Sequence, residues 1–147
     1  MAIDENKITP QWLAGFFDGE GCVSCYLAKG VMKLDVFVAQ SHRPIIETIG
    51  RIFGERPRVH CKTKRICYSL HFSGRGCRPF LEYIKDHVIV KREQVFLALE
   101  MAALIGNSGP PKNGIDQGRR IVLGEQIRKL NHVDQDDLVN DGKETLQ

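Results

Sequence analysis

A row of basic side chains is the first feature of the sequence that suggests chemistry. Arg56, Arg58, His60 and Lys62 stand at alternating positions, and alternating residues of a β-strand lie on one face. Cationic groups gathered on one face suit an anionic partner, and a two-stranded β-ribbon fits the major groove of DNA. The row favours a nucleic acid as the partner, and a merely hydrated basic surface is the alternative.

The charge distribution points the same way. The chain of 147 residues has a formal net charge of +3, but residues 51–92 hold 11 Lys or Arg against 3 Asp or Glu, a net charge of +8. Residues 132–147 hold 5 acids and 1 Lys. A basic middle with an acidic end indicates a polyanion as the partner, and nucleic acid is the usual one.

A second feature lies in the segment WLAGFFDGEG, residues 12–21. Gly15 and Gly19 are four positions apart, with Ala14 beside them, and each glycine costs a helix about 1 kcal/mol relative to alanine. Small residues at this spacing let two helices approach closely. The segment therefore predicts a helix that packs against a copy of itself. The alternative is a glycine-rich helix end without such a role.

The cysteines suggest a different chemistry. Cys22 and Cys25 form a C-x-x-C pair that could begin a zinc site, and its remaining ligands could come from His60, Cys61, Cys67, His71 and Cys77. However, the pair falls in a segment with strand character, where positions three apart face opposite sides. No Gly or Pro provides a turn between the two thiols. Free thiols are therefore expected, with zinc as the alternative.

Hydrophobic periodicity and turn residues predict the elements that position these groups. Helices are predicted over residues 11–20, 43–53, 78–88, 91–105 and 117–130. Strands are predicted over residues 22–28 and 31–40 and on both sides of the turn Thr63-Lys64. Thr9-Pro10 begins the first helix, and Gly54 ends the second. Helix, hairpin, helix, hairpin and further helices predict an α+β fold with a four-stranded antiparallel sheet.

The predicted sheet has one apolar and one polar face. Val59, Cys61 and Ile66 are expected on the apolar side, against the helices. The polar side, and with it a DNA-binding surface, is expected to carry Ser24, Tyr26, Lys33, Asp35, Arg56, Arg58, His60, Lys62, Arg65, Ser69 and His71. One domain is predicted over residues 1–131, with a loop over 106–114 and a flexible acidic tail over 132–147.

The N-terminus is polar and lacks the basic-then-apolar form of a signal peptide, and no apolar run approaches the ~20 residues of a membrane span. An intracellular protein without a membrane partner is therefore expected.

LAGFFDGEG, residues 13–21, closely resembles the LAGLIDADG signature of homing endonucleases and related intron maturases. The order of elements also resembles the αββαββα fold of that family, with its saddle-shaped sheet. Family members carry one motif and dimerise, or two motifs in one chain. A single motif here implies a homodimer through the motif helix. The interface residues implied are Leu13, Ala14, Gly15, Phe17 and Gly19.

The resemblance also implies the catalytic groups. Glu20 stands at the motif position that binds the catalytic Mg²⁺ or Mn²⁺, together with the backbone carbonyl of Gly19, and Ca²⁺ is expected to bind without supporting cleavage. Lys91 resembles the lysine that organises the nucleophilic water, and Gln40 resembles the polar residue that positions it. Arg43 is a further candidate. For Lys91 and Arg43 the alternative is ordinary surface charge near a helix start.

The implied function is that of an intron-encoded, metal-dependent endonuclease of a bacterial or phage-infected cytoplasm or of an organelle. Its homodimer would hydrolyse both strands of a pseudo-palindromic double-stranded DNA site of about 20 base pairs, leaving 3′ overhangs. The main alternative on the same scaffold is an intron maturase that acts on RNA, or a DNA-binding protein that does not cut. A small soluble domain with a chance motif is a third hypothesis, which the agreement of motif, element order and basic face disfavours.

Overall fold

The computed structural model describes residues 2–105 and 114–144, except for the side chains of residue 62 and of residues 133–144. Its elements are η1 (Glu5–Lys7), α1 (Pro10–Glu20), β1 (Gly21–Ala28), β2 (Val31–Gln40), α2 (Arg43–Phe53), β3 (Arg58–Lys62), β4 (Arg65–Ser73), η2 (Gly74–Cys77), α3 (Arg78–Ile84), α4 (Arg92–Leu104) and α5 (Gly114–Glu144). The strands form one antiparallel sheet in the order β1-β2-β4-β3. The predicted α+β class and four-stranded antiparallel sheet are confirmed.

Local sequence signals explain the ends of the helices near the site. Thr9 precedes α1, its Oγ1 accepts a hydrogen bond from the backbone N–H of Trp12 at 3.1 Å, and Pro10 opens the first turn. Gly54 follows α2 with a φ of 73°, in the left-handed region that glycine enters without steric cost. Both predicted boundaries, the start at Thr9-Pro10 and the stop at Gly54, are confirmed.

Tight turns at the two predicted positions close the two hairpins. Lys29 and Gly30 have φ values of 51° and 75° between β1 and β2, the pair of positive values that suits a two-residue hairpin turn. Thr63, with a φ of 58°, and Lys64 separate β3 from β4. The hairpins join through β2 and β4, where Phe37 lies opposite His71.

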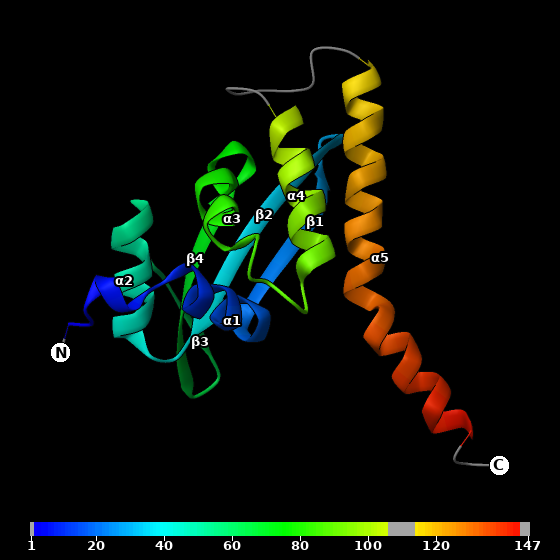
Figure 1. The fold of residues 1–147 in the computed structure, drawn as a ribbon. Coiled ribbons are helices and arrows are strands. Elements are labelled where there is room, and N and C mark those ends of the chain that lie inside the picture. The colour runs from blue at the N-terminus through cyan, green and yellow to red at the C-terminus, as the bar shows by residue number, and fades with distance from the viewer. Residues whose placement is uncertain (1, 106–113, 145–147) are drawn as a thin grey trace.

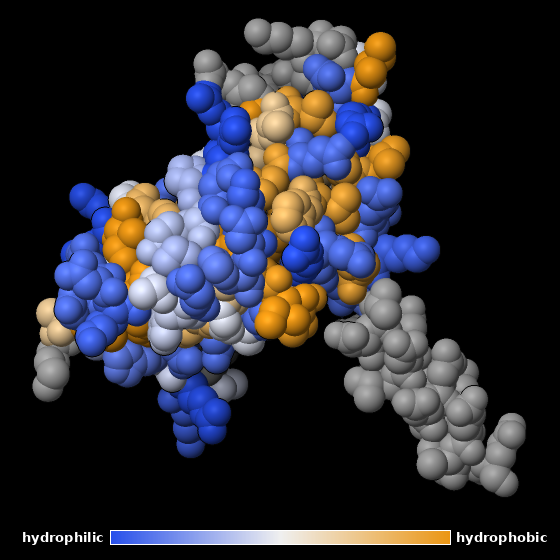
Figure 2. Space-filling view, viewed as in Figure 1, coloured by the Kyte–Doolittle hydropathy of each residue, from blue (hydrophilic) through white to orange (hydrophobic). Residues whose placement is uncertain are grey.

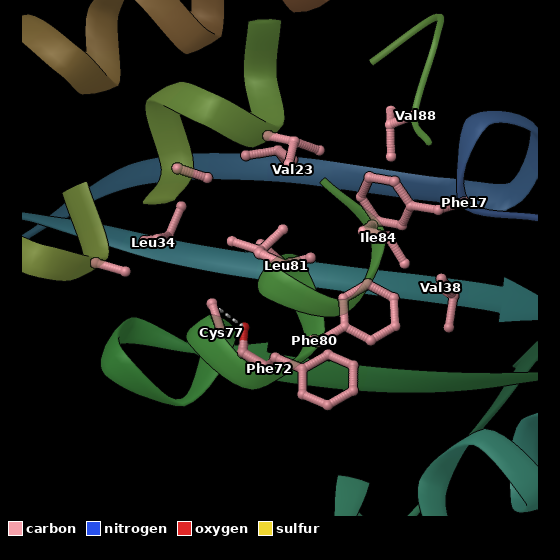
Figure 3. Close-up of a cluster of buried hydrophobic side chains, with 14 of the residues drawn as sticks. Phe17, Val23, Leu34, Val38, Phe72, Cys77, Phe80, Leu81, Ile84 and Val88 are labelled. Atoms are coloured by element: carbon pink, nitrogen blue, oxygen red, sulfur yellow. Dashed lines mark hydrogen bonds between the residues drawn. The ribbon is translucent and has the colours of Figure 1, made fainter. Parts of the chain in front are cut away.

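The core lies between the sheet and the helices, and α1, α3 and α4 cross in front of the strands in Figure 1. Phe72 of β4 stacks on Phe80 of α3 with ring centroids 4.6 Å apart, and Phe17 of α1 meets Phe80 edge-on at 5.6 Å (Figure 3). Through these buried rings, α1 packs against α3, and α3 packs against the sheet. The motif helix is therefore built into the core of its own subunit.

The inward positions at the tip of the second hairpin are a correction to the sequence prediction. Val59, Cys61 and Ile66 do lie on the helix side of the strands, but Val59 and Ile66 are 61% and 52% exposed and Cys61 is exposed as well. The hairpin extends beyond the described helices, so none of them covers its tip (Figure 1), and the tip is hydrophilic in Figure 2. Alternation assigned the correct face, but burial also requires a neighbouring layer.

Several predicted boundaries also differ from the structure. α3 ends at Ile84 rather than at residue 88, and α5 runs from Gly114 to Glu144 instead of covering residues 117–130. β3 begins at Arg58, so Arg56 precedes the strand and is followed by Pro57, which has no N–H for the ladder. Residues 106–113 of the predicted loop lie outside the described residues. None of the described helices is long and apolar enough to cross a membrane.

Candidate functional site

The C-terminal ends of α1 and β2 meet through a pair of polar side chains. Nε2 of Gln40 donates a hydrogen bond to Oε1 of Glu20 at 3.2 Å. The amide oxygen of Gln40 accepts from the backbone N–H and the hydroxyl of Ser41, at 2.8 and 3.1 Å. Because the oxygen is occupied by Ser41, the amino end of the amide is directed to Glu20. Two of the residues predicted for catalysis are therefore in direct contact.

Asp18 holds a third predicted residue at the same end of α1. The Asp18 carboxylate accepts hydrogen bonds from the backbone N–H groups of Ile89 at 2.9 Å and Lys91 at 3.0 Å. In return, Nζ of Lys91 donates to the backbone carbonyl of Asp18 at 2.6 Å. The ammonium group thus sits at the C-terminal end of α1, where a cation is favoured. Asp18 has a structural role here. The residue that Lys91 contacts, Asp18, is two positions before Glu20 in α1.

Arg43 points elsewhere. Its Nε lies 2.5 Å from Oε1 of Glu47, one turn further along α2, and its guanidinium lies 5.9 Å from the ring centroid of Tyr68. The hydrogen bond to Glu47 raises the pKa of the Arg43 guanidinium. Tyr68 pairs with Gln40 between β4 and β2, so Arg43 is near the site without touching Glu20. Glu20 and Gln40 are therefore in contact, Lys91 is held at the same end of α1, and Arg43 is engaged with its own helix.

The end of α1 fits a hard divalent cation. Glu20 is exposed and offers a carboxylate, and the last carbonyls of a helix have no intrahelical donor. Gly19 is exposed, and a Cβ placed there would meet nothing within 4 Å, so the approach is open. Oxygen donors of this kind suit Mg²⁺ or Ca²⁺. Within the described residues of one chain, no three His, Cys, Asp or Glu side chains converge in a metal-binding group.

The polar face of the sheet carries the residues predicted for DNA contact. Register pairs Ser24 with Asp35 and Tyr26 with Lys33, and the second hairpin pairs Arg58 with Ser69. Antiparallel partners share a face, so these side chains lie on the side away from the helices. Lys62 and Arg65 are the last pair before the turn. Arg56 lies beside the strand rather than in it, and the other predicted residues with described side chains share this face.

Four residues of this face are bonded to each other, which was not predicted. Asp35, His71, Ser69 and His60 form a continuous hydrogen-bonded chain across β2, β4 and β3. Ser73, a residue that sequence analysis did not include, donates to Asp35 at 3.2 Å. The alternation of β4 contains the signal for Ser73, since it is in phase with Ser69 and His71. Alternation gives the shared face, but the contacts depend on the register between strands.

The motif helix has a buried side and an open side. Leu13, Ala14 and Phe17 are completely buried in the subunit, so their side chains are not available to a second copy. The open side carries Gly15 and Gly19, where an added Cβ would meet nothing within 4 Å. Trp12 and Phe16 stack beside this glycine row with centroids 5.1 Å apart. Of the five residues predicted for the interface, three have side chains in the core of the subunit and the two glycines lie on the open side, and the interface itself stays a prediction.

The cysteine pair does not form a metal-binding group. Cys25 is buried beside Met101 on the core side of β1, and Cys22 lies on the polar side, so the two thiols face apart as expected for strand positions. Burial raises the pKa of the Cys22 thiol and raises that of Cys25 to about 12. Zinc requires thiolates, which burial disfavours. All five cysteines are free thiols.

No model of a protein family and no curated protein sequence matches the chain. Solved structures do match it. The homing endonuclease I-CvuI, solved with its target in the presence of Ca, has a TM-score of 0.69 at 21% identity, over 86% of this chain and 82% of that one. The archaeal intron-encoded homing endonuclease I-Vdi141I, complexed with DNA, has a TM-score of 0.66 at 22% identity, over 92% and 99% of the two chains.

The LAGLIDADG meganuclease I-AabMI, bound to uncleaved DNA, has a TM-score of 0.64 at 22% identity. The match covers 80% of this chain and 44% of that one, so the chain spans about half of this relative. The chain therefore has the LAGLIDADG endonuclease fold, and the resemblance noted in the motif is confirmed at the level of the fold. In size it corresponds to I-CvuI and I-Vdi141I, and to one half of I-AabMI.

Proposed function

We propose that the protein is a site-specific homing endonuclease that hydrolyses both strands of a long pseudo-palindromic DNA site. The observation that carries the proposal is the grouping of Glu20, Gln40 and Lys91 at one end of the motif helix. A carboxylate, an amide and an ammonium group together can bind a cation, position a water and neutralise a phosphate. The structural neighbours I-CvuI and I-Vdi141I are homing endonucleases solved with DNA, which supports the same function.

The sheet supports the choice of double-stranded DNA. Its polar face carries Arg58, His60 and Arg65 on one hairpin and Lys33 and Tyr26 on the other. A basic segment supplies the phosphate contacts that dominate affinity, and a two-stranded ribbon fits the major groove. The two hairpins of each subunit would lie along one half-site. With the hairpins on the half-sites, the C-terminal end of the motif helix would face the DNA backbone between the two half-sites.

The proposed active unit is a homodimer. Two motif helices packed through Gly15 and Gly19 would bring the two Glu20 carboxylates near a common axis. Each chain contributes one Glu20, one Gln40 and one Lys91, and each composite site would cut one strand. Because the motif helices would sit over the minor groove between the half-sites, the two cuts would leave short 3′ overhangs. The aromatic pair Trp12 and Phe16 would flank the helix contact.

Glu20 and the carbonyl of Gly19 would hold Mg²⁺ or Mn²⁺. A divalent cation bound there would polarise the scissile phosphate and lower the pKa of a bound water. Gln40 fixes the direction of the Glu20 carboxylate through its hydrogen bond. Lys91 holds a positive charge next to the position of the phosphate and is itself held by Asp18. These contacts preorganise the site before DNA binds.

The decisive experiment is a selection for cut molecules from a randomised DNA library, with Mg²⁺ or with Ca²⁺ present. We expect a symmetric consensus of about 20 base pairs with Mg²⁺, and binding without cutting with Ca²⁺. Glu20→Gln should abolish cutting and keep DNA affinity within about tenfold, because it removes a ligand charge with little change of volume. Cutting by Glu20→Gln at the wild-type rate would overturn the site. Binding without any cutting by the wild type would favour the non-cleaving alternative.

A further inference from the structure

Three strands contribute to one chain of hydrogen bonds on the polar face of the sheet. Nδ1 of His71 lies 3.0 Å from Oδ2 of Asp35, and Nε2 of His71 lies 3.1 Å from Oγ of Ser69. The same Ser69 oxygen lies 2.7 Å from Nε2 of His60. The chain thus runs from Asp35 on β2 through β4 to His60 on β3. His60, at its end, is exposed to the surface that the proposed function assigns to DNA.

With both imidazoles neutral, hydrogen-bonding capacity determines the direction of every bond in this chain. An ionised carboxylate accepts only, so the proton between Asp35 and His71 is on Nδ1 of His71. In a neutral imidazole the other nitrogen is then an acceptor, so the single hydroxyl hydrogen of Ser69 is donated to Nε2 of His71. Ser69 can only accept from His60, whose proton is therefore on Nε2. Nδ1 of His60 remains as a lone-pair acceptor.

The surroundings hold the chain in place. The side chains of Asp35 and His71 are only 19% and 16% exposed, and Ser69 is buried, so water competes weakly for these bonds. Phe37 stacks on the His71 ring with centroids 5.0 Å apart and fixes its plane. Ser73 donates to the second carboxylate oxygen of Asp35 at 3.2 Å. Asp35, Ser69 and the His71 ring are thereby oriented before a ligand arrives.

We propose that Asp35 acts as a positioning residue that, through His71 and Ser69, fixes the tautomer of His60, so that DNA meets an acceptor nitrogen. The inference rests on the proposed function for its ligand. In the major groove the only hydrogen-bond donors are the exocyclic amino groups of cytosine and adenine. His60 therefore selects a base whose amino group faces it. Guanine, through O6 and N7, and thymine, through O4, would place an acceptor against the acceptor nitrogen of His60. These two bases are therefore disfavoured.

The same geometry has an alternative that the structure disfavours. Asp, His and Ser at these distances resemble the groups of a serine hydrolase. Ser69, however, is 3% exposed, and its oxygen already accepts a bond from His60. A nucleophile must reach its substrate with a free lone pair. Ser69 is thus a link between two histidines, and the chemistry of the chain is recognition.

The first test needs no DNA. Ring ¹⁵N chemical shifts, measured by NMR on the free protein, distinguish the two neutral tautomers of each histidine. We expect the proton on Nδ1 of His71 and on Nε2 of His60. Asp35→Asn places an amide where a carboxylate stood, and its amino group can donate to Nδ1 of His71, as occurs when the Asp of a catalytic triad is replaced. Both histidines should then change tautomer. A His60 that keeps the wild-type tautomer would overturn the proposal.

The role of Ser69 is tested by a cycle of variants. Ser69→Ala removes the link, so Asp35→Asn should no longer change the tautomer of His60 when it is made in the Ser69→Ala chain. It should still change that of His71. Ser73→Ala is the matched control, because it removes a bond to Asp35 without interrupting the chain, and both tautomers should persist. A response of His60 to Asp35→Asn without Ser69 would contradict transmission through the hydroxyl.

The second test measures recognition. His60→Ala identifies the base pair that His60 contacts, as the position where a binding selection loses its preference in both half-sites. At that position the wild type should prefer adenine or cytosine by roughly fivefold to tenfold, the effect of one good hydrogen bond. Asp35→Asn should move the preference toward guanine or thymine with total affinity nearly kept. If Asp35→Asn binds with the wild-type preference, the tautomer does not decide the base. Failure of all variants and of the wild type to bind would instead count against the proposed function.

Discussion

Gln40, the last residue of β2, donates a hydrogen bond to Glu20, the last residue of α1, over 3.2 Å. The contact joins the end of α1 to the end of the first hairpin. It orients the Glu20 carboxylate, the one carboxylate of the motif helix that accepts no hydrogen bond from the backbone. Asp18, two residues earlier, accepts two backbone N–H groups. Within the motif, Asp18 therefore stabilises the fold, and Glu20 is exposed to solvent.

The first prediction concerns Gln40. Gln40→Ala should lower the cleavage rate about 10- to 100-fold with DNA affinity nearly unchanged, the usual cost of losing a residue that orients a metal ligand. The measurement is single-turnover cleavage beside a binding titration in Ca²⁺. Ser41→Ala is the control, since it removes one of two bonds to the Gln40 oxygen and keeps the contact with Glu20. Equal losses in the two variants would argue against a specific role for Gln40.

The second prediction concerns Asp18. Asp18→Ala leaves the N–H groups of Ile89 and Lys91 without their acceptor, so the free energy of unfolding should fall by about 1–3 kcal/mol. Urea denaturation measures the loss, and amide hydrogen exchange at residues 89 and 91 should accelerate. Asp18→Asn retains one acceptor oxygen and should lose about half as much. A variant as stable as the wild type, with protected amides, would show that the segment before α4 is held by other contacts.

Much of this arrangement could be predicted from the sequence, and the misses have physical reasons. Alternation placed Asp35, Ser69 and His71 on one face, because strand geometry is local. Their mutual bonds depend on the register between β2 and β4, which no short pattern specifies. Val59 alternates like a core residue yet is exposed, because burial depends on whether a helix covers that length of strand.

The residues predicted for catalysis illustrate the same difference. Glu20 and Gln40 could be found because each ends a predictable element, and their contact follows from the fold. The ion pair of Arg43 with Glu47 can also be predicted from the sequence, because the two residues are four apart on one helix. The sequence does not predict whether Arg43 would leave Glu47 to bind a DNA phosphate. For the motif helix, spacing identified two glycines on an open side, whereas Leu13, Ala14 and Phe17 of the same motif face the core.

The third prediction concerns assembly. Gly15 lies on the open side of α1, so Gly15→Leu should leave the subunit folded but force two motif helices apart. The mass in solution at micromolar concentration should fall from dimer to monomer, with circular dichroism unchanged. Gly118→Leu is the matched control, because Gly118 is also an exposed helical glycine with open space, on α5. A wild type that is monomeric at that concentration would argue against the interface.

The fourth prediction concerns the thiols. Burial raises the pKa of Cys25 and of Cys77 to about 12, from an ordinary value of 9.0. At pH 8 a thiol reagent should therefore modify the exposed Cys61 and leave Cys25 and Cys77 intact until the chain unfolds. Because the folded pKa is the higher one, the stability that these two thiols contribute is complete below pH 9.0. It declines as the pH rises from there to about 12.

Mass spectrometry after brief labelling, with and without urea, checks the thiol prediction. Labelling of Cys25 in the folded chain at the rate of Cys61 would mean that the core around Met101 opens readily.

The fifth prediction concerns DNA affinity. Arg58 lies on the polar face of β3, opposite Ser69, whereas Arg56 precedes the strand. If Arg58 binds phosphate, Arg58→Ala should weaken all sequences alike and reduce the salt slope of binding by about one unit per contact, counted once for each subunit. If it binds a guanine edge, the loss should be about 1–3 kcal/mol at one base pair of each half-site. A salt series and a site library separate the two outcomes.

The controls for Arg58 must come from outside the sheet face. Val59 and Cys61, on the opposite face of β3, cannot serve as buried control positions because both are exposed at the hairpin tip. Arg78 is an exposed arginine at the start of α3, an element that packs on the helix side of the sheet, so Arg78→Ala should bind like the wild type at every salt concentration. If Arg58→Ala also does so at the selected site, β3 does not face DNA. The sheet would then need a different partner even with the motif helix intact.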